Sequence, residues 1–227
     1  MQNGNADKQQ IVSNAAFDFA YDMALRDATL RAASTGIPLD ELRKVPDART
    51  VVKGHIEWLL EEVRTNYSEV FLVTAKDLEE AFHDNSVPPN HFTFGNAQKV
   101  ISMTAKYLYV GAQYSPDMRS RFSVCHCPMD SVMIEFVASF LNSGSISTLE
   151  PNEEETLTEF KNAYMRSISR GVNKGKLIWD GPSWSTMTSD DENKYKHFQA
   201  VIRIIGRHHT PQLSPLEVDL VNWKPGE

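Results

Sequence analysis

Apolar residues recur at intervals of three and four along most of this 227-residue chain, and this period is what most restricts its fold. In segment 14–34, for example, Phe17, Tyr21 and Leu25 fall on one face of a helix. Alternation typical of a strand is almost missing, and Val70 to Val73 is the only candidate. The sequence therefore predicts an all-α protein.

We expect about eight helices in a bundle. They form a single domain over 1–227 or, alternatively, two interleaved lobes. The helix over 129–141 is apolar nearly all round, which predicts a position deep in the core. Residues 171–188 are predicted to form an irregular loop. The main predicted helices are 14–34, 47–66, a short one capped by Thr74, 95–110, 129–141, 151–170 and 189–208.

Net charge is −7, which argues against broad, charge-driven binding of nucleic acid. The charges are unevenly distributed, however. An acidic block at 150–159 is followed by Lys161, Arg166, Arg170 and further lysines with no acid among them. This order fits a helix whose terminal charges complement its own dipole. It also fits a local, positively charged surface that binds an anionic ligand. Both interpretations stay open.

The chain has no apolar run of the ~20 residues that a membrane span needs, and its start has no secretory signal. Cys125 and Cys127 are too close in sequence for an unstrained disulfide, so we expect reduced thiols and a cytoplasmic protein. His126 between them does not complete a zinc site, which normally needs four ligands. We predict no metal, no cofactor, no membrane association and no obligate protein partner.

The most informative stretch is Gly95 to Asp130. Gly95 stands where a long helix begins, so a phosphate could approach the exposed amides of Gly95 and Asn96. Lys99 and Lys106 are seven residues apart and share one face of that helix. They suit an ordinary exposed face, but a lysine in a cleft could attack a sugar C1′ as an amine nucleophile.

Asp130 follows Pro128 and precedes the apolar helix 129–141, which predicts an N-cap or first-turn position. A capping role alone would explain this residue. A carboxylate in a cleft could instead stabilise the positive charge that develops on a sugar when its N-glycosidic bond breaks, and could orient the attacking water.

The order of glycine turn, lysine-bearing helix, loop and proline-x-aspartate resembles the core of the helix-hairpin-helix DNA glycosylases. The resemblance implies a helix-hairpin-helix-like element and the catalytic aspartate within 90–141, beside a DNA-binding cleft. It assigns Asp130 as the catalytic carboxylate and Lys99 as the approximate position of the nucleophilic lysine. The turn 92–96 has one glycine and no proline, and residues 113–124 look like an insertion. These departures favour a monofunctional enzyme that uses water.

Within that superfamily, Gly95-Asn96-Ala97-Gln98-Lys99 and the later His126-Cys127-Pro128 resemble a divergent bacterial group of anti-phage glycosylases. The implied partner is double-stranded phage DNA, and the implied substrate is glucosylated hydroxymethylcytosine. The expected activity is flipping of this modified base and hydrolysis of its N-glycosidic bond, which would leave an abasic site.

Two groups of side chains would serve that activity, beyond the catalytic candidates. The predicted DNA contacts are Gly95, Asn96, Gln98, Lys106, Arg119, Arg121, Arg166, Arg170 and Lys174. The predicted base pocket uses Tyr107, His126, Trp179 and Trp184, of which the aromatic residues could stack on a flipped base.

Two other classes of function compete. Acidic pairs such as Glu61 with Glu62 could bind magnesium in a metal-dependent helical nucleotide hydrolase or nuclease, although adjacent acids on a helix point to different faces. A non-enzymatic helical adaptor would also suit the acidic composition.

Overall fold

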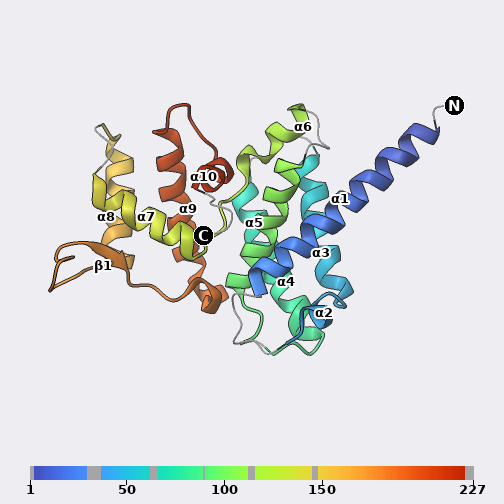
Figure 1. The fold of residues 1–227 in the computed structure, drawn as a ribbon, viewed down its shortest axis with the longest axis horizontal. Coiled ribbons are helices and arrows are strands. Elements are labelled where there is room, and N and C mark those ends of the chain that lie inside the picture. The colour runs from blue at the N-terminus through green and yellow to red at the C-terminus, as the bar shows by residue number, and fades with distance from the viewer. Residues whose placement is uncertain are drawn as a thin grey trace. The chain divides into compact units, whose positions relative to one another are not determined.

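The computed structural model describes residues 3–29, 37–61, 66–88, 90–111, 116–144 and 148–222, with side chains from residue 13 onward (Figure 1). The chain is mostly helical, as predicted from its apolar period, and its only sheet in the described residues has two strands. It divides into two compact units, one ending at Cys125 and one beginning at His126. None of the described helices has the length and apolar character to cross a membrane.

In the first unit, α5 packs against α1 and α4, and α3 packs against α4. Its elements are α1 (Asn3–Thr29), α2 (Leu39–Leu42), α3 (Pro46–Leu60), α4 (Tyr67–Asp84), α5 (Phe94–Val110), α6 (Pro116–Ser120) and a 3₁₀ turn, Arg121–Val124. The prediction that a short helix begins at Thr74 was wrong, because α4 already begins at Tyr67 and includes the strand candidate Val70–Val73. Phe71, Ala75 and Leu78 form one buried helical stripe there. The predicted end of the helix over 14–34 lies outside the described residues.

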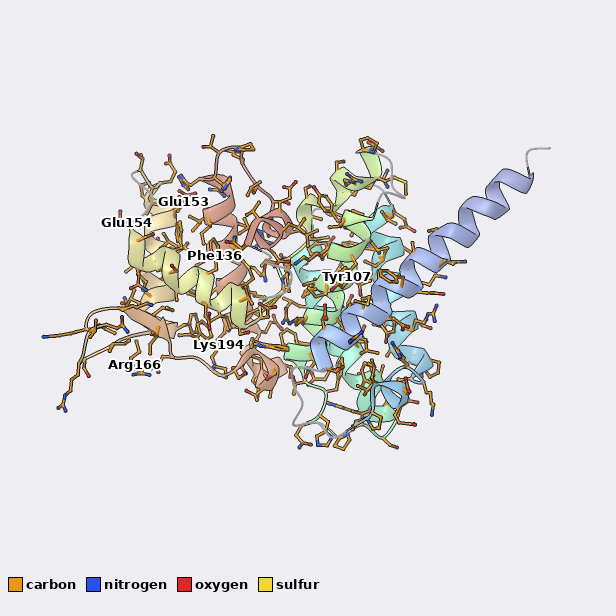
Figure 2. The ribbon with its side chains drawn as sticks, viewed as in Figure 1. Tyr107, Phe136, Glu153, Glu154, Arg166 and Lys194 are labelled. Carbon is orange, nitrogen blue, oxygen red and sulfur yellow. The ribbon has the colours of Figure 1, made fainter. Side chains whose placement is uncertain are left out.

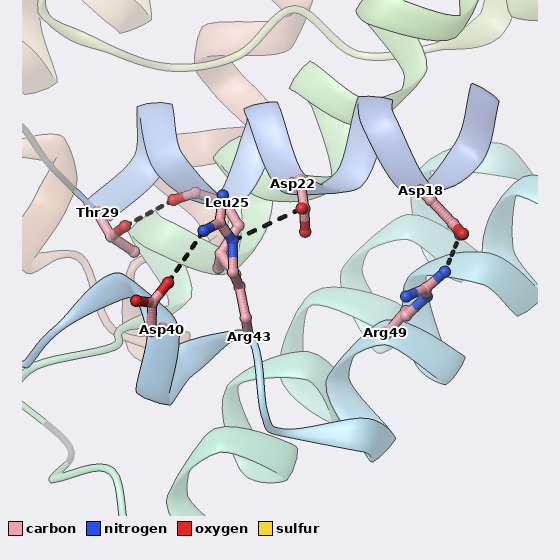
Figure 3. A network of polar contacts seen from close by, with 7 residues as sticks. All are labelled: Asp18, Asp22, Leu25, Thr29, Asp40, Arg43 and Arg49. Atoms are coloured by element: carbon pink, nitrogen blue, oxygen red, sulfur yellow. Dashed lines mark hydrogen bonds and ion pairs between the residues drawn. The ribbon is translucent and has the colours of Figure 1, made fainter. Parts of the chain in front are cut away.

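Ion pairs connect α1 with α2 and α3, the two helices that follow it (Figure 3). Arg49 of α3 contacts Asp18 of α1. Arg43, at the end of α2, lies 3.6 Å from Asp22 of α1 and 3.1 Å from Asp40. Since all five side chains are at least partly exposed to solvent, these pairs add little to the free energy of unfolding.

A buried histidine joins α3 to α4. The Nδ1 atom of His55 lies 3.2 Å from the Thr74 hydroxyl, and its Nε2 atom lies 3.5 Å from the Tyr67 hydroxyl. Its ring is 5.8 Å from the ring of Trp58 and 5.9 Å from that of Phe71. Burial lowers the pKa of His55 to about 4, so the imidazole is neutral in the folded protein at pH 7.

In the second unit, α8 packs against α9, α9 packs against α10, and β2 lies on α7. Its elements are α7 (Ser131–Ser143), α8 (Pro151–Tyr164), β1 (Met165–Ser167), β2 (Leu177–Trp179), two 3₁₀ turns (Trp184–Thr186 and Ser189–Asp191), α9 (Glu192–Arg207) and α10 (Pro215–Asn222). The helix predicted over 151–170 ends earlier, because residues 165–167 pair as a strand with 177–179. This hairpin replaces part of the irregular loop predicted over 171–188.

Glu153 connects the beginning of α8 to the end of α9 (Figure 2). Its buried carboxylate accepts hydrogen bonds from Arg207 at 2.6 Å and from His208 at 2.7 Å. It also accepts the backbone N–H of Glu150 at 3.1 Å and so closes the capping box of α8. The bond from His208 is the main reason why the pKa of Glu153 lies below its usual range.

The prediction that helix 129–141 lies deep in the core was wrong. One face of α7 is buried, through residues such as Met133 and Val137, while Val132 is 45% exposed. Ser131, Glu135 and Ser139, four residues apart, form an exposed polar stripe. This stripe was overlooked in the sequence because apolar residues outnumber polar residues in this helix. The stripe faces the pocket described below.

Candidate functional site

The N-terminus of α5 is closed by groups of the protein itself. Thr93 and Asn96 form a capping box, and the Glu79 carboxylate accepts the N–H of Phe94 at 3.0 Å. Asn96 also donates to the carbonyl of Ala28 in α1 at 2.8 Å. Gly95 is buried within this arrangement. A carboxylate at this position would repel a phosphate, so the DNA contacts predicted at Gly95 and Asn96 are not supported.

The other candidates on α5 also have positions that suit packing rather than binding. Gln98 is fully buried and donates to the carbonyl of Gly95 at 2.9 Å. Lys99 and Lys106 are only 4% and 2% exposed. Tyr107 donates a hydrogen bond to Asp27 and thereby links α5 to α1. The exposed surface that a DNA-reading helix needs is missing from these described positions of α5.

Two arginines of the first unit also contact neighbouring protein groups. Arg121 donates to the carbonyl oxygens of Leu60 and Glu61 at the C-terminal end of α3, where a cation complements the helix dipole. The Arg119 guanidinium lies 5.8 Å from the ring centre of Tyr109, in a cation–π contact. Arg121 is therefore a helix-capping residue, and its predicted phosphate contact would compete with this role.

Asp130 is the N-cap of α7, as its position in the sequence predicted. Its Oδ1 atom accepts the N–H of Met133 at 3.1 Å. The side chain is half-buried, whereas the preceding residues 125–129 are buried. The carboxylate therefore lies at the edge of the packed interior, one residue before the first residue of the helix that carries the polar stripe.

The segment before Asp130 is held by a glutamine far away in sequence. Gln199 of α9 accepts the N–H of Cys127 at 3.0 Å and donates to its carbonyl at 2.6 Å. His126, which is buried, lies 3.1 Å from the Tyr195 hydroxyl of the same helix. His126 thus has a structural role. Contacts with α9 fix the position of His126 and Cys127, just before Asp130.

We expect Gln199→Leu to destabilise the second unit, since it leaves a buried N–H and a buried carbonyl of Cys127 without partners. The expected loss is about 2–4 kcal/mol in the free energy of unfolding, measured by urea denaturation. Gln199→Glu keeps the acceptor and the size, but it removes the donor and buries a carboxylate against the carbonyl of Cys127, so we expect it to be at least as destabilising as the Leu variant. A Leu variant as stable as the wild type would show that the two hydrogen bonds contribute nothing.

A pocket of about 580 Å³ lies between α7 and the hairpin of the second unit. The polar stripe of α7 forms one wall, beginning at Ser131, directly after Asp130. Strand β2 and the turn that follows it form the other wall. The lining residues are Ser131, Ile134, Glu135, Ala138, Ser139, Lys176, Leu177, Ile178, Trp179, Ser183 and Trp184.

Two predicted pocket residues, Trp179 and Trp184, do line this pocket. The indole of Trp179 donates to the carbonyl of Pro182 at 2.9 Å and stacks on Tyr164 with 5.9 Å between ring centres. A Cβ atom at Gly181 would lie only 2.3 Å from the Trp179 ring, so glycine is required there for the indole to pack. The tryptophan that faces the pocket is therefore held rigidly.

A side chain of α7 also holds β2, the strand that forms the opposite wall of the pocket. The side chain of Asn142 accepts the N–H of Leu177 at 2.7 Å and donates to its carbonyl at 2.9 Å. Asn142 therefore satisfies the outer edge of β2 as a third strand would. Sequence reasoning missed Asn142, Ser131 and Glu135. The four-residue spacing of Ser131, Glu135 and Ser139 was the signal that could have found the pocket-facing stripe.

The predicted cations of the second unit lie on the hairpin. Arg166 of β1, which is labelled in Figure 2, pairs with Asp180 at 2.9 Å. Arg170 and Lys174 lie in the connection between the strands and are exposed. Lys176, one residue before β2, lines the pocket. The structure thus brings together Trp179, Trp184 and the basic hairpin, beside the helix that Asp130 begins.

Within the described residues, no group of three or more histidine, cysteine, aspartate or glutamate side chains is placed to hold a metal ion. Comparisons with family models, curated proteins and solved structures found no match for this chain.

Proposed function

We propose that this protein is a monofunctional DNA glycosylase whose catalytic site lies in its second unit. One observation carries this proposal: the capping carboxylate Asp130 directly precedes the wall of a pocket that contains two tryptophans and a lysine. The order of residues that resembles the helix-hairpin-helix glycosylases supports the same activity. We further propose a modified cytosine of phage DNA as the substrate and anti-phage defence as the purpose.

The pocket is suited to an everted nucleotide. Its volume of about 580 Å³ is within the usual ~300–1,000 Å³ range of small-molecule sites, which leaves room for a base that carries a bulky substituent. The fixed indole of Trp179 offers a flat surface for stacking, and base–aromatic stacking contributes about 1–3 kcal/mol per base. Ser131, Glu135 and Ser139 provide hydrogen-bonding groups for a polar substituent such as a sugar.

The reaction at Asp130 is a hydrolysis. As the C1′–N bond breaks, its electron pair leaves with the base, and positive charge develops on the sugar. The carboxylate stabilises that charge and accepts a proton from the water that attacks C1′. The products are an abasic sugar and the free base, which takes up a proton. No step uses a protein amine, in keeping with the burial of Lys99.

We expect the full-length protein to release base from DNA that contains glucosylated hydroxymethylcytosine, and to do so in EDTA. The measurement is incubation with modified and unmodified duplexes, followed by mass spectrometry of the free base and gel analysis of alkali-labile sites. Release from modified DNA alone would support both the activity and the substrate. Strand cleavage without base release, and only after magnesium is added, would instead establish the metal-dependent nuclease.

A further inference from the structure

The hairpin of the second unit continues beyond its two short strands. The N–H of Ile168 donates to Lys176 at 2.9 Å, and the N–H of Gly175 donates to the carbonyl of Ile168 at 2.8 Å. Gly171 and Gly175 have φ values of 83° and 88°, which only glycine adopts without strain. The turn is therefore a defined loop, and in Figure 1 it extends away from the helices of its own unit.

The charge on this hairpin is one-sided. Residues 165–179 contain two arginines and two lysines but no acid, in a chain with a net charge of −7. Arg166 is neutralised by Asp180. Arg170, Lys174 and Lys176 are exposed, and no carboxylate within the described part of the chain forms an ion pair with them. The hairpin thus offers three cations to an external anion, Arg170 and Lys174 in its connecting loop and Lys176 at its root.

An apolar side chain stands among these cations. Val172 is completely exposed at 105%, the largest exposure among the large hydrophobic residues of the described chain. A fully exposed valine in the turn of a hairpin contributes nothing to the core. Its position between Arg170 and Lys174 places an apolar wedge within reach of any polyanion that those side chains bind.

We propose that residues 165–179 form a DNA-binding arm. In this arm Arg170, Lys174 and Lys176 contact phosphates, and Val172 inserts between base pairs from the minor groove. Proteins that kink DNA from the minor groove combine basic side chains with apolar wedges, most often Phe, Leu, Ile, Met or Pro, and a β-branched valine offers the same kind of apolar surface. The inference rests on the proposed function, since the root of the arm, from Lys176 to Trp179, is also a wall of the pocket.

DNA fits this arm better than an anionic membrane surface. Membrane-surface binding depends on a large apolar face, such as that of an amphipathic helix, in addition to positive charge. The tip of this hairpin has only one fully exposed valine, which would bury too little apolar area in a bilayer. Three cations around a single wedge instead match the repeating phosphates and the stacked base steps of a duplex.

The first test is the salt dependence of binding to an unmodified duplex, followed by fluorescence anisotropy. Three phosphate contacts predict a slope of log K against log salt of about −2.7 from the arm alone. The double variant Arg170→Ala with Lys174→Ala should make the measured slope shallower by about 1.8. A matched control replaces Lys161 of α8 and Lys196 of α9, which lie outside the hairpin, and should leave the slope unchanged.

The second test isolates the wedge. Val172→Ser should keep the salt slope but lose the DNA bend, measured by energy transfer between dyes at the ends of a 30-base-pair duplex. Val172→Leu should keep the bend. An unchanged bend in Val172→Ser, or equal slopes for the hairpin and control variants, would overturn the proposal. So would binding of wild-type protein to phosphatidylserine vesicles without binding to duplex.

These measurements separate the arm from the catalytic assignment. Binding and bending are recorded on unmodified DNA, where no base release is expected. If the arm variants behave as predicted and no base is ever released, the DNA-binding arm stands and the glycosylase assignment fails. If base is released but hairpin variants bind and bend DNA as the wild type does, only the arm is wrong.

Discussion

Asp130→Asn is expected to reduce base release by at least ~100-fold while leaving the fold and DNA binding intact. Asparagine caps helices about as well as aspartate, so its side-chain oxygen can still accept the N–H of Met133. The amide carries no negative charge, however, and can neither stabilise a cationic sugar nor accept a proton from water. Loss of a single stabilising group at a reacting centre typically costs ~10²–10³ in rate.

The measurement is single-turnover release of base from modified duplex, with circular dichroism and urea unfolding as checks on the fold. Glu135→Gln is the matched control, because Glu135 is a second carboxylate of the same helix and lines the pocket directly. We expect this variant to change substrate affinity more than the rate of bond cleavage. If Glu135→Gln abolishes release and Asp130→Asn does not, the catalytic carboxylate is Glu135.

His55 is expected to make the first unit lose stability as the pH falls from 6.5 to 4. Burial lowers its pKa in the folded protein to about 4, from an ordinary value of 6.5. Below pH 6.5 the unfolded chain binds a proton at this residue and the folded chain does not, so protonation favours unfolding. The stabilisation is complete above pH 6.5 and is lost progressively down to pH 4. The expected loss is about 3 kcal/mol.

Other groups titrate in the same range, so the informative quantity is the difference between wild type and His55→Gln at each pH. Unfolding in urea at pH 7.5, 5.5 and 4.5 can be followed by fluorescence, since Trp58 lies 5.8 Å from His55 and is the only tryptophan of the first unit. The variant should be less stable at pH 7.5 and should depend less on pH. His209→Gln, an exposed control, should keep the wild-type pH dependence. Parallel pH profiles for wild type and His55→Gln would contradict the prediction.

Several structural features were predictable because they depend on residues close together in sequence. The mostly helical fold follows from the three-and-four apolar period, which is a property of each segment by itself. Asp130 as an N-cap and Pro151 in the first turn of α8 follow from local backbone chemistry. The same local rules failed at β1. A helix was predicted to continue past Tyr164 to residue 170, but residues 165–167 form a strand.

The candidate site was only partly predictable. Of the four residues predicted for the base pocket, Trp179 and Trp184 line the pocket of the second unit, whereas Tyr107 and His126 do not. The polar stripe of α7 was overlooked among its many apolar neighbours. The phosphate contact predicted at Gly95 is not supported for a different reason: the Glu79 carboxylate occupies that helix end by accepting the N–H of Phe94, fifteen residues later in the sequence.

By itself, the sequence determined the mostly helical character of the chain, the capping role of Asp130 and the segments that carry positive charge. The tertiary structure alone decided which of those side chains remain accessible. Lys99 and Lys106 share a helix face, as their spacing requires, yet both are buried. Gln199 holds Cys127 from 72 residues away. Periodicity and capping are local, whereas burial and long-range hydrogen bonds exist only once distant segments have packed together.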